Sequence, residues 1–79
     1  MILDKYHREA HIRFFQAIDA LMAEGISQRT ICGKTRIDRR NLFAYREMGR
    51  VPLAWVISLV IEFGISAEWL LTGKGKMFN

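Results

Sequence analysis

Three places in this 79-residue chain show the same pattern, in which an isoleucine precedes a serine or aspartate and then a helix-forming segment. The pattern occurs at Ile26-Ser27, Ile37-Asp38 and Ile65-Ser66. Serine and aspartate cap helices well because their side-chain oxygen accepts a hydrogen bond from a free N–H of the first turn. An apolar residue before the cap packs against the residue at the fourth helical position. In the three segments that position holds Ile31, Leu42 and Leu70. The pattern therefore predicts three helix starts.

The other ends of the helical segments are marked by glycine, which readily adopts the left-handed conformation that closes a helix. The glycines in question are Gly25, Gly49, Gly64 and Gly73. Starts and stops together predict five helices, at about Leu3–Glu24, Ser27–Thr35, Asp38–Met48, Pro52–Phe63 and Ser66–Thr72. Since no segment alternates with a period of two residues, we expect an all-α fold, and the length predicts one domain over residues 1–79.

The apolar pattern indicates which helices form the core. The first predicted helix has apolar residues at helical spacing, namely Ile12, Phe15, Ile18 and Met22. The fourth, LAWVISLVIEF, is apolar nearly all round, which is typical of a central buried helix.

The cysteine content and the apolar runs of the chain indicate the compartment in which it is expected. The single cysteine, Cys32, allows no disulfide within the chain, which favours a reducing compartment. The first ten residues contain no apolar run of the kind found in signal peptides. The longest apolar run, Leu53 to Ile61, is far shorter than the roughly 18–20 residues that cross a membrane. We therefore expect a cytoplasmic protein that does not span a membrane.

Positive charge is concentrated in the middle of the chain. Residues 28–50 contain seven basic and two acidic residues, a net charge of +5, whereas the whole chain carries +4. The basic residues are Arg29, Lys34, Arg36, Arg39, Arg40, Arg46 and Arg50. A basic block between nearly neutral flanks indicates a surface for a polyanion.

The same block contains two helices separated by only about two residues, Arg36 and Ile37. Helices joined so tightly cross steeply, as in a helix-turn-helix unit, here at about residues 27–48. Its expected packing positions are Ile31, Thr35, Ile37, Leu42 and Tyr45, with the small Cys32 at the closest approach. The opposite stripe of the second helix holds Arg39, Arg40, Phe43 and Glu47.

That stripe suits the major groove of DNA. Arginine can hold guanine O6 and N7 with two hydrogen bonds, and an aromatic ring can contact a thymine methyl group. In helix-turn-helix motifs the first residues of the second helix contact the bases, which here are Arg39 and Arg40. Phe43 has an alternative, which is to fold back onto the fourth helix.

The stretch ISQRTICGKTRIDRRNLFAY resembles the helix-turn-helix of the lambdoid-phage repressor and Cro (XRE-type) superfamily. The later stretch VPLAWVISLVIEFGISAEWLLTGKG is similar to the closing helices of phage CI-type repressor domains. The resemblance covers about residues 12–76 without gaps and implies a five-helix lambda-repressor-like domain. It also implies a phosphate contact by Gln28, base contacts by Arg39, Arg40, Phe43 and Ala44, and backbone contacts by the loop Gly49–Val51 with Arg50. Dimerisation through the last helix, around Trp69, is implied as well.

The chain departs from the family pattern at two positions. The turn residue that is usually glycine is Arg36, and a left-handed backbone there would cost about 1–2 kcal/mol. Thr35 stands where a larger aliphatic residue is usual. Our hypothesis is that Arg36 is tolerated because it adds a phosphate contact.

Other candidate sites have simpler interpretations. His7 and His11 are four residues apart but lack the further ligands of a zinc site, so we interpret both as surface residues. Cys32 is interpreted as a structural thiol, and Gly73-Lys74-Gly75-Lys76 as a helix stop rather than a phosphate loop. No nucleophile is accompanied by a base, so we expect no enzyme, metal, cofactor or small-molecule ligand.

The sequence thus favours a DNA-binding transcriptional regulator, most simply a phage-type repressor that binds duplex DNA as a homodimer. Two alternatives stay open. One is a protein-interaction module on the same fold, since fold does not determine function. The other is the DNA-binding half of a longer repressor.

Overall fold

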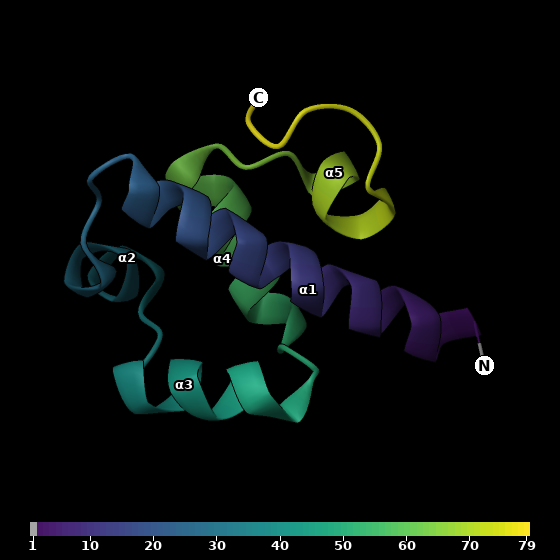
Figure 1. The fold of residues 1–79 in the computed structure, drawn as a ribbon, viewed down its shortest axis with the longest axis horizontal. Helices are drawn as coiled ribbons and strands as arrows, with labels where there is room; N and C mark the ends of the chain where they lie inside the picture. The colour runs from purple at the N-terminus through teal and green to yellow at the C-terminus, as the bar shows by residue number, and fades with distance from the viewer. Residues whose placement is uncertain (1) are drawn as a thin grey trace.

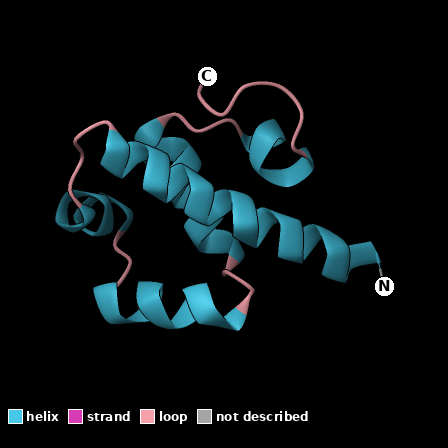
Figure 2. Cartoon of the chain, viewed as in Figure 1, coloured by secondary structure: helices cyan, strands magenta, loops and turns pink. Residues whose placement is uncertain are grey.

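The computed structural model describes the backbone of residues 2–79 and the side chains from His7 onward. The described chain forms five helices, whose arrangement is shown in Figure 1. They are α1 (Ile2–Ala23), α2 (Gln28–Thr35), α3 (Arg39–Met48), α4 (Leu53–Phe63) and α5 (Ala67–Thr72). No strand occurs in these residues (Figure 2), and a single antiparallel bridge pairs Ile65 with Phe78. The predicted all-α fold of five helices is confirmed.

The three predicted helix starts are present with their caps. The Ser27 hydroxyl accepts from the Thr30 N–H at 3.1 Å, the Asp38 carboxylate from the Arg40 N–H at 2.8 Å, and Ser66 from the Trp69 N–H at 3.2 Å. The apolar residues at the fourth helical positions are all buried, namely Ile31, Leu42 and Leu70. Each cap therefore combines a local hydrogen bond with a side chain that enters the core.

Helix α1 crosses α4 and lies beside α5 (Figure 1), and it contributes much of the core. Its fully buried residues include Phe14, Ala17, Ile18 and Leu21. The predicted stripe was wrong at both ends, since Ile12 is 52% exposed and Met22 is 44% exposed. Burial on α1 follows the positions of its neighbouring helices, which periodicity in one segment does not reveal.

Helix α4 is buried on one side only, which corrects the expectation of a central helix surrounded by protein. Val56 and Leu59 are buried, whereas Leu53, Ile57 and Ile61 are 67%, 49% and 72% exposed. The three exposed residues are four apart and so lie on one outward face. A domain of this size has too few elements to cover a helix on every side.

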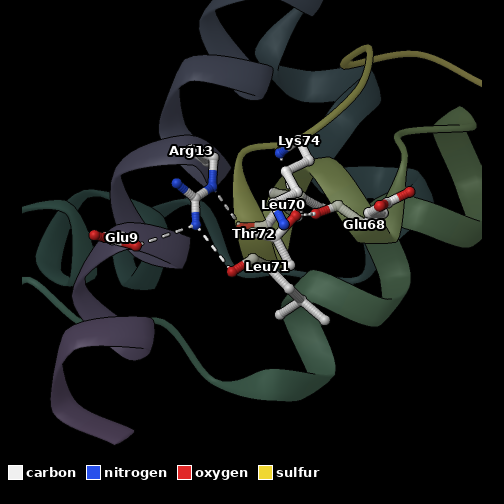
Figure 3. Close-up of polar contacts among 7 residues, drawn as sticks. All are labelled: Glu9, Arg13, Glu68, Leu70, Leu71, Thr72 and Lys74. Carbon is white, nitrogen blue, oxygen red and sulfur yellow. Dashed lines mark hydrogen bonds and ion pairs between the residues drawn. The ribbon is translucent and has the colours of Figure 1, made fainter. Parts of the chain in front are cut away.

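Arg13 attaches α5 to α1 (Figure 3). Its guanidinium donates to the Leu70 carbonyl at 2.7 Å and to the Leu71 carbonyl at 3.0 Å, and it lies 3.8 Å from the Glu9 carboxylate. The last carbonyls of a helix lack partners within it and are stabilised by a cation. Arg13 therefore caps α5 from a helix that is distant in sequence.

The segment after α5 behaves as a helix stop, as predicted. Gly73 has a φ of 80° and its N–H donates to the Trp69 carbonyl at 2.8 Å. The chain then returns along the start of α5, where the Ser66 N–H donates to the Met77 carbonyl at 2.7 Å. The Asn79 N–H donates to the Gly64 carbonyl at 2.9 Å, so the terminal residues pack over the α4–α5 connection.

Candidate nucleic-acid interface

Helix α3 lies at one edge of the molecule, at the bottom of Figure 1. It begins at the Asp38 cap and ends at Gly49, and its one fully buried residue is Leu42. Tyr45 is half-buried, with its ring edge-on to Trp55 at 4.8 Å between centroids. Leu42 and Tyr45 face the core, and most of the other side chains of α3 are exposed.

The stripe opposite Leu42 is exposed, as predicted. Arg39, Arg40, Ala44 and Glu47 are all exposed, and Phe43 is 54% exposed. Phe43 therefore does not fold back into the core beside α4. Leu42 and Tyr45 are three residues apart and so lie on the same face of α3, which is its inner face. The residues on the opposite face are therefore exposed.

Four residues at the start of α3 line one open hollow of about 470 Å³, namely Asp38, Arg39, Arg40 and Phe43. The hollow presents two guanidinium groups beside an aromatic ring. The Asp38 carboxylate already accepts from the Arg40 backbone N–H, so it stabilises the helix start as well as lining the hollow. Guanidinium groups bind planar acceptor pairs, such as those of phosphates and guanine edges.

The other predicted contact residues lie outside this hollow. Gln28 is the first residue of α2 and is half-buried, while Arg36 is exposed between α2 and α3. Ala44 is exposed on α3, one residue beyond Phe43. Arg50 is exposed in the connection from α3 to α4. The structure thus brings together Arg39, Arg40 and Phe43 and places the remaining candidates on neighbouring segments.

The turn between α2 and α3 has the left-handed geometry considered from the sequence. Arg36 has φ 59° and ψ 32°, and it is the one non-glycine residue with positive φ in residues 2–79. The N–H groups of Arg36 and Ile37 both donate to the Cys32 carbonyl. The buried Thr35 hydroxyl donates to the Ile31 carbonyl at 2.7 Å, which satisfies the polar group that replaces an aliphatic side chain.

Replacing Arg36 with glycine is expected to raise the free energy of unfolding by about 0.5–1 kcal/mol. Relief of the left-handed conformation gains about 1–2 kcal/mol, and the greater entropy of glycine in the unfolded chain offsets part of it. Urea denaturation of the two proteins measures the difference. A midpoint lowered by the substitution would show that the Arg36 side chain stabilises the turn.

The arginines of the interface differ in their surroundings. Within the described residues, no acidic side chain forms an ion pair with the guanidinium of Arg36, Arg39 or Arg40, whereas the Arg46 guanidinium donates to Asp19 at 3.1 Å. Lys34 lies over the Phe63 ring at 5.9 Å from its centroid. The arginines without such an ion pair therefore include Arg36 in the turn and Arg39 and Arg40 at the start of α3.

Cys32 is half-buried in α2, and burial raises the pKa of its thiol above the ordinary value. The nearby Arg39 charge acts in the opposite direction, and the Asp38 carboxylate adds to the increase in pKa. A raised pKa keeps the thiol protonated and weakly reactive at neutral pH. This agrees with the interpretation of Cys32 as a structural thiol.

The prediction that both histidines lie at the surface was wrong for His11, although His7 is exposed. His11 is 7% exposed, and its Nε2 donates to the Arg46 carbonyl at 3.2 Å. Its partner lies 35 residues further along the chain, so local spacing carried no signal of this contact. In the described residues, no group of three or more His, Cys, Asp or Glu side chains could hold a metal ion.

None of the described helices has both the length and the apolar character needed to cross a membrane. Comparison with protein families matches residues 20–78 to the bacteriophage CI repressor helix-turn-helix domain. Curated proteins and solved structures give no match. The matched region covers most of the chain, from the end of α1 to the segment after α5, and includes α2, α3 and the hollow. The chain therefore belongs to the bacteriophage CI repressor helix-turn-helix family, a family of DNA-binding regulatory domains.

Proposed function

We propose that this protein is a sequence-specific transcriptional regulator, a repressor of the phage or mobile-element type, and that α3 reads the major groove of DNA. The observation that carries the proposal is the start of α3, where exposed Arg39, Arg40 and Phe43 line one hollow at the edge of the molecule. In this proposal α2 and α3 form the helix-turn-helix unit.

Each side chain at the start of α3 has a distinct role in the proposed complex. Arg39 and Arg40 occupy the first two helical positions, so their side chains lie at the end of α3 that would enter the groove. A guanidinium that pairs with guanine O6 and N7 distinguishes that base from the other three. Phe43 and Ala44, further along, would contact apolar groups such as a thymine methyl.

Phosphate contacts would set the register of the protein on the duplex. Gln28 begins α2, where the first N–H groups of the helix favour an anion. Arg36 in the turn and Arg50 in the α3–α4 connection add cationic side chains on either side of α3. Such contacts position the protein without reading the sequence.

We also propose that the protein binds as a two-fold homodimer, with half-sites separated by one helical turn, roughly 34 Å. Apolar surface near the last helix supports this, since Leu71 is 44% and Phe78 is 41% exposed while Trp69 is half-buried. Footprinting on a bound site gives the spacing. A single, non-palindromic half-site would contradict the dimer.

A protein-interaction module on the same fold would expose mainly apolar residues at the start of α3. The residues there are instead charged, which favours DNA. Selection of bound duplexes from a random pool tests the proposal and reads the operator at the same time. Enrichment of a common sequence supports it, whereas recovery no better than that of an unrelated protein of equal charge would refute it.

Affinity for DNA should fall steeply as salt rises. If each protomer neutralises roughly three to four phosphates, the dimer should show a log–log slope of about −5 to −7. Titrations between about 50 and 200 mM salt measure this slope. A slope near zero would indicate that the basic surface does not contact DNA phosphates and would favour the protein-interaction alternative.

A further inference from the structure

One residue at the end of α3, Arg46, contacts α1 in three ways. Its carbonyl accepts from His11 Nε2 at 3.2 Å, and its guanidinium lies over the Phe15 ring at 4.4 Å from the centroid. Its Nη2 donates to Asp19 Oδ1 at 3.1 Å. His11, Phe15 and Asp19 are four residues apart and so share one face of α1. We call these four residues the α1–α3 clamp.

The hydrogen bond made by His11 is partly buried. The Arg46 carbonyl belongs to the last turn of α3, where carbonyls lack partners within the helix. Since a carbonyl can only accept, Nε2 carries the proton. The ring packs against Phe15 at 4.9 Å between centroids, and Nδ1 is buried with no partner among the described residues. The Arg46 carbonyl is thus the group that holds this imidazole by hydrogen bonding.

Apart from the clamp, α3 itself contributes few side chains to the core. Leu42 is its one fully buried residue, and Tyr45 packs edge-on against Trp55. A helix held at one buried side chain can turn and tilt about that point, so contacts near its far end determine its angle. Tyr45 and Arg46 supply those contacts, and Arg46 reaches α1 through both its backbone and its side chain.

We propose that Arg46 is a positioning residue for DNA reading, which holds α3 at the angle that presents Arg39 and Arg40, and that it does not itself contact DNA. This inference rests on the proposed function. Loss of the clamp would leave α3 in its binding-competent orientation for a smaller fraction of the time. The apparent operator affinity falls in proportion to that fraction, whereas binding to random DNA depends mainly on charge.

The sequence favoured a different interpretation, in which Arg46 is one more charge in the basic block. The two interpretations differ for Asp19→Asn, which removes the ion pair and raises the net charge by one. If charge alone matters, operator and random DNA should both bind more tightly, with their affinity ratio unchanged. If the clamp positions α3, the ratio of operator to random affinity should fall.

The experiment compares Asp19→Asn with a matched control, Glu24→Gln, which makes the same charge change at an exposed residue just after α1. Both side chains of the ion pair are substantially exposed, at 40% for Arg46 and 61% for Asp19. Exposed pairs have modest effects, so we expect Asp19→Asn to lower the affinity ratio about two- to fivefold. The ratio for Glu24→Gln should equal that of the unaltered protein.

Arg46→Met removes the ion pair and the stacked cation together, so the affinity ratio should fall further, by roughly tenfold if the competent fraction drops to about a tenth. Arg46→Lys retains the ion pair and should recover part of the loss. In the Arg46→Met background Asp19→Asn should cause no additional fall, because the two side chains act through one contact. An additional fall of the same size as in the unaltered protein would contradict the clamp.

Backbone amide exchange of the free protein gives a readout that needs no DNA. In Asp19→Asn the amides of α3 should exchange faster while those of α4 keep their rates, which indicates local loosening rather than global destabilisation. Unchanged α3 exchange, or an unchanged affinity ratio in a protein that binds its operator, would overturn the positioning role alone. If the unaltered protein binds no DNA, the proposed function fails, and the DNA-reading role of Arg46 fails with it.

Discussion

Arg39→Ala and Arg40→Ala are each expected to weaken operator binding by about 1–3 kcal/mol and to relax the preference at one base pair. Both arginines are exposed at the start of α3 and line the same hollow as Phe43, and their guanidinium groups form no ion pair among the described residues. Each substitution removes a guanidinium that would bind a guanine, and the discrimination of that base is lost with it. The affinity for random DNA should therefore change much less. Titration of each variant on operator and random duplexes measures the difference.

Arg50→Ala provides the comparison, because the proposed role of Arg50 is a backbone contact. Its removal should weaken binding to operator and random DNA alike and reduce the salt slope by about one. If Arg39→Ala and Arg40→Ala both leave the ratio of operator to random affinity unchanged, α3 reads DNA through another surface or does not read it.

Leu42→Ala is expected to lower the free energy of unfolding by about 2–5 kcal/mol, because Leu42 is 2% exposed and a cavity would replace it. A small domain has a total stability not far above this loss, so a large fraction of the variant should be unfolded at 37 °C. DNA binding should fall with it, since Leu42 is the one fully buried side chain of the helix that carries Arg39 and Arg40.

Leu53→Ala is the matched control for Leu42→Ala. The side-chain change is identical, but Leu53 is 67% exposed on the outward face of α4, so its loss should change stability by about 0.5 kcal/mol or less. Urea denaturation of the two variants measures both effects. Equal midpoints would mean that Leu42 does not hold α3 against the core.

The family resemblance seen in the sequence is confirmed, and so is the all-α fold. The expected roles of Gln28, Arg36, Arg39, Arg40, Phe43, Ala44 and Arg50 remain predictions. The structure supports their accessibility to different degrees. Gln28 is half-buried and the others are exposed, but only Arg39, Arg40 and Phe43 share a hollow. The sequence identified these residues through their position after a helix cap, which is a local property.

The local structure of the chain could be predicted from its sequence. The caps Ser27, Asp38 and Ser66 bond to N–H groups two or three residues away, so their effect is contained in a short stretch of chain. For the same reason each predicted helix boundary lies within one residue of the observed one. The exposed stripe of α3 was also predictable, because Leu42 and Tyr45 define its inner face.

The buried faces of α1 and α4 and the partners of the charged side chains could not be predicted, because they depend on how the helices pack together. Arg46 contacts Asp19, which is 27 residues away in the sequence, and His11, which is 35 residues away. Arg13 donates to the Leu70 carbonyl, which is 57 residues away. Such contacts depend on how the helices pack, and the periodicity of a single segment is the same whichever neighbour covers it. His11 was therefore misplaced at the surface and Arg46 assigned to the basic block, although packing makes both part of the contact between α1 and α3.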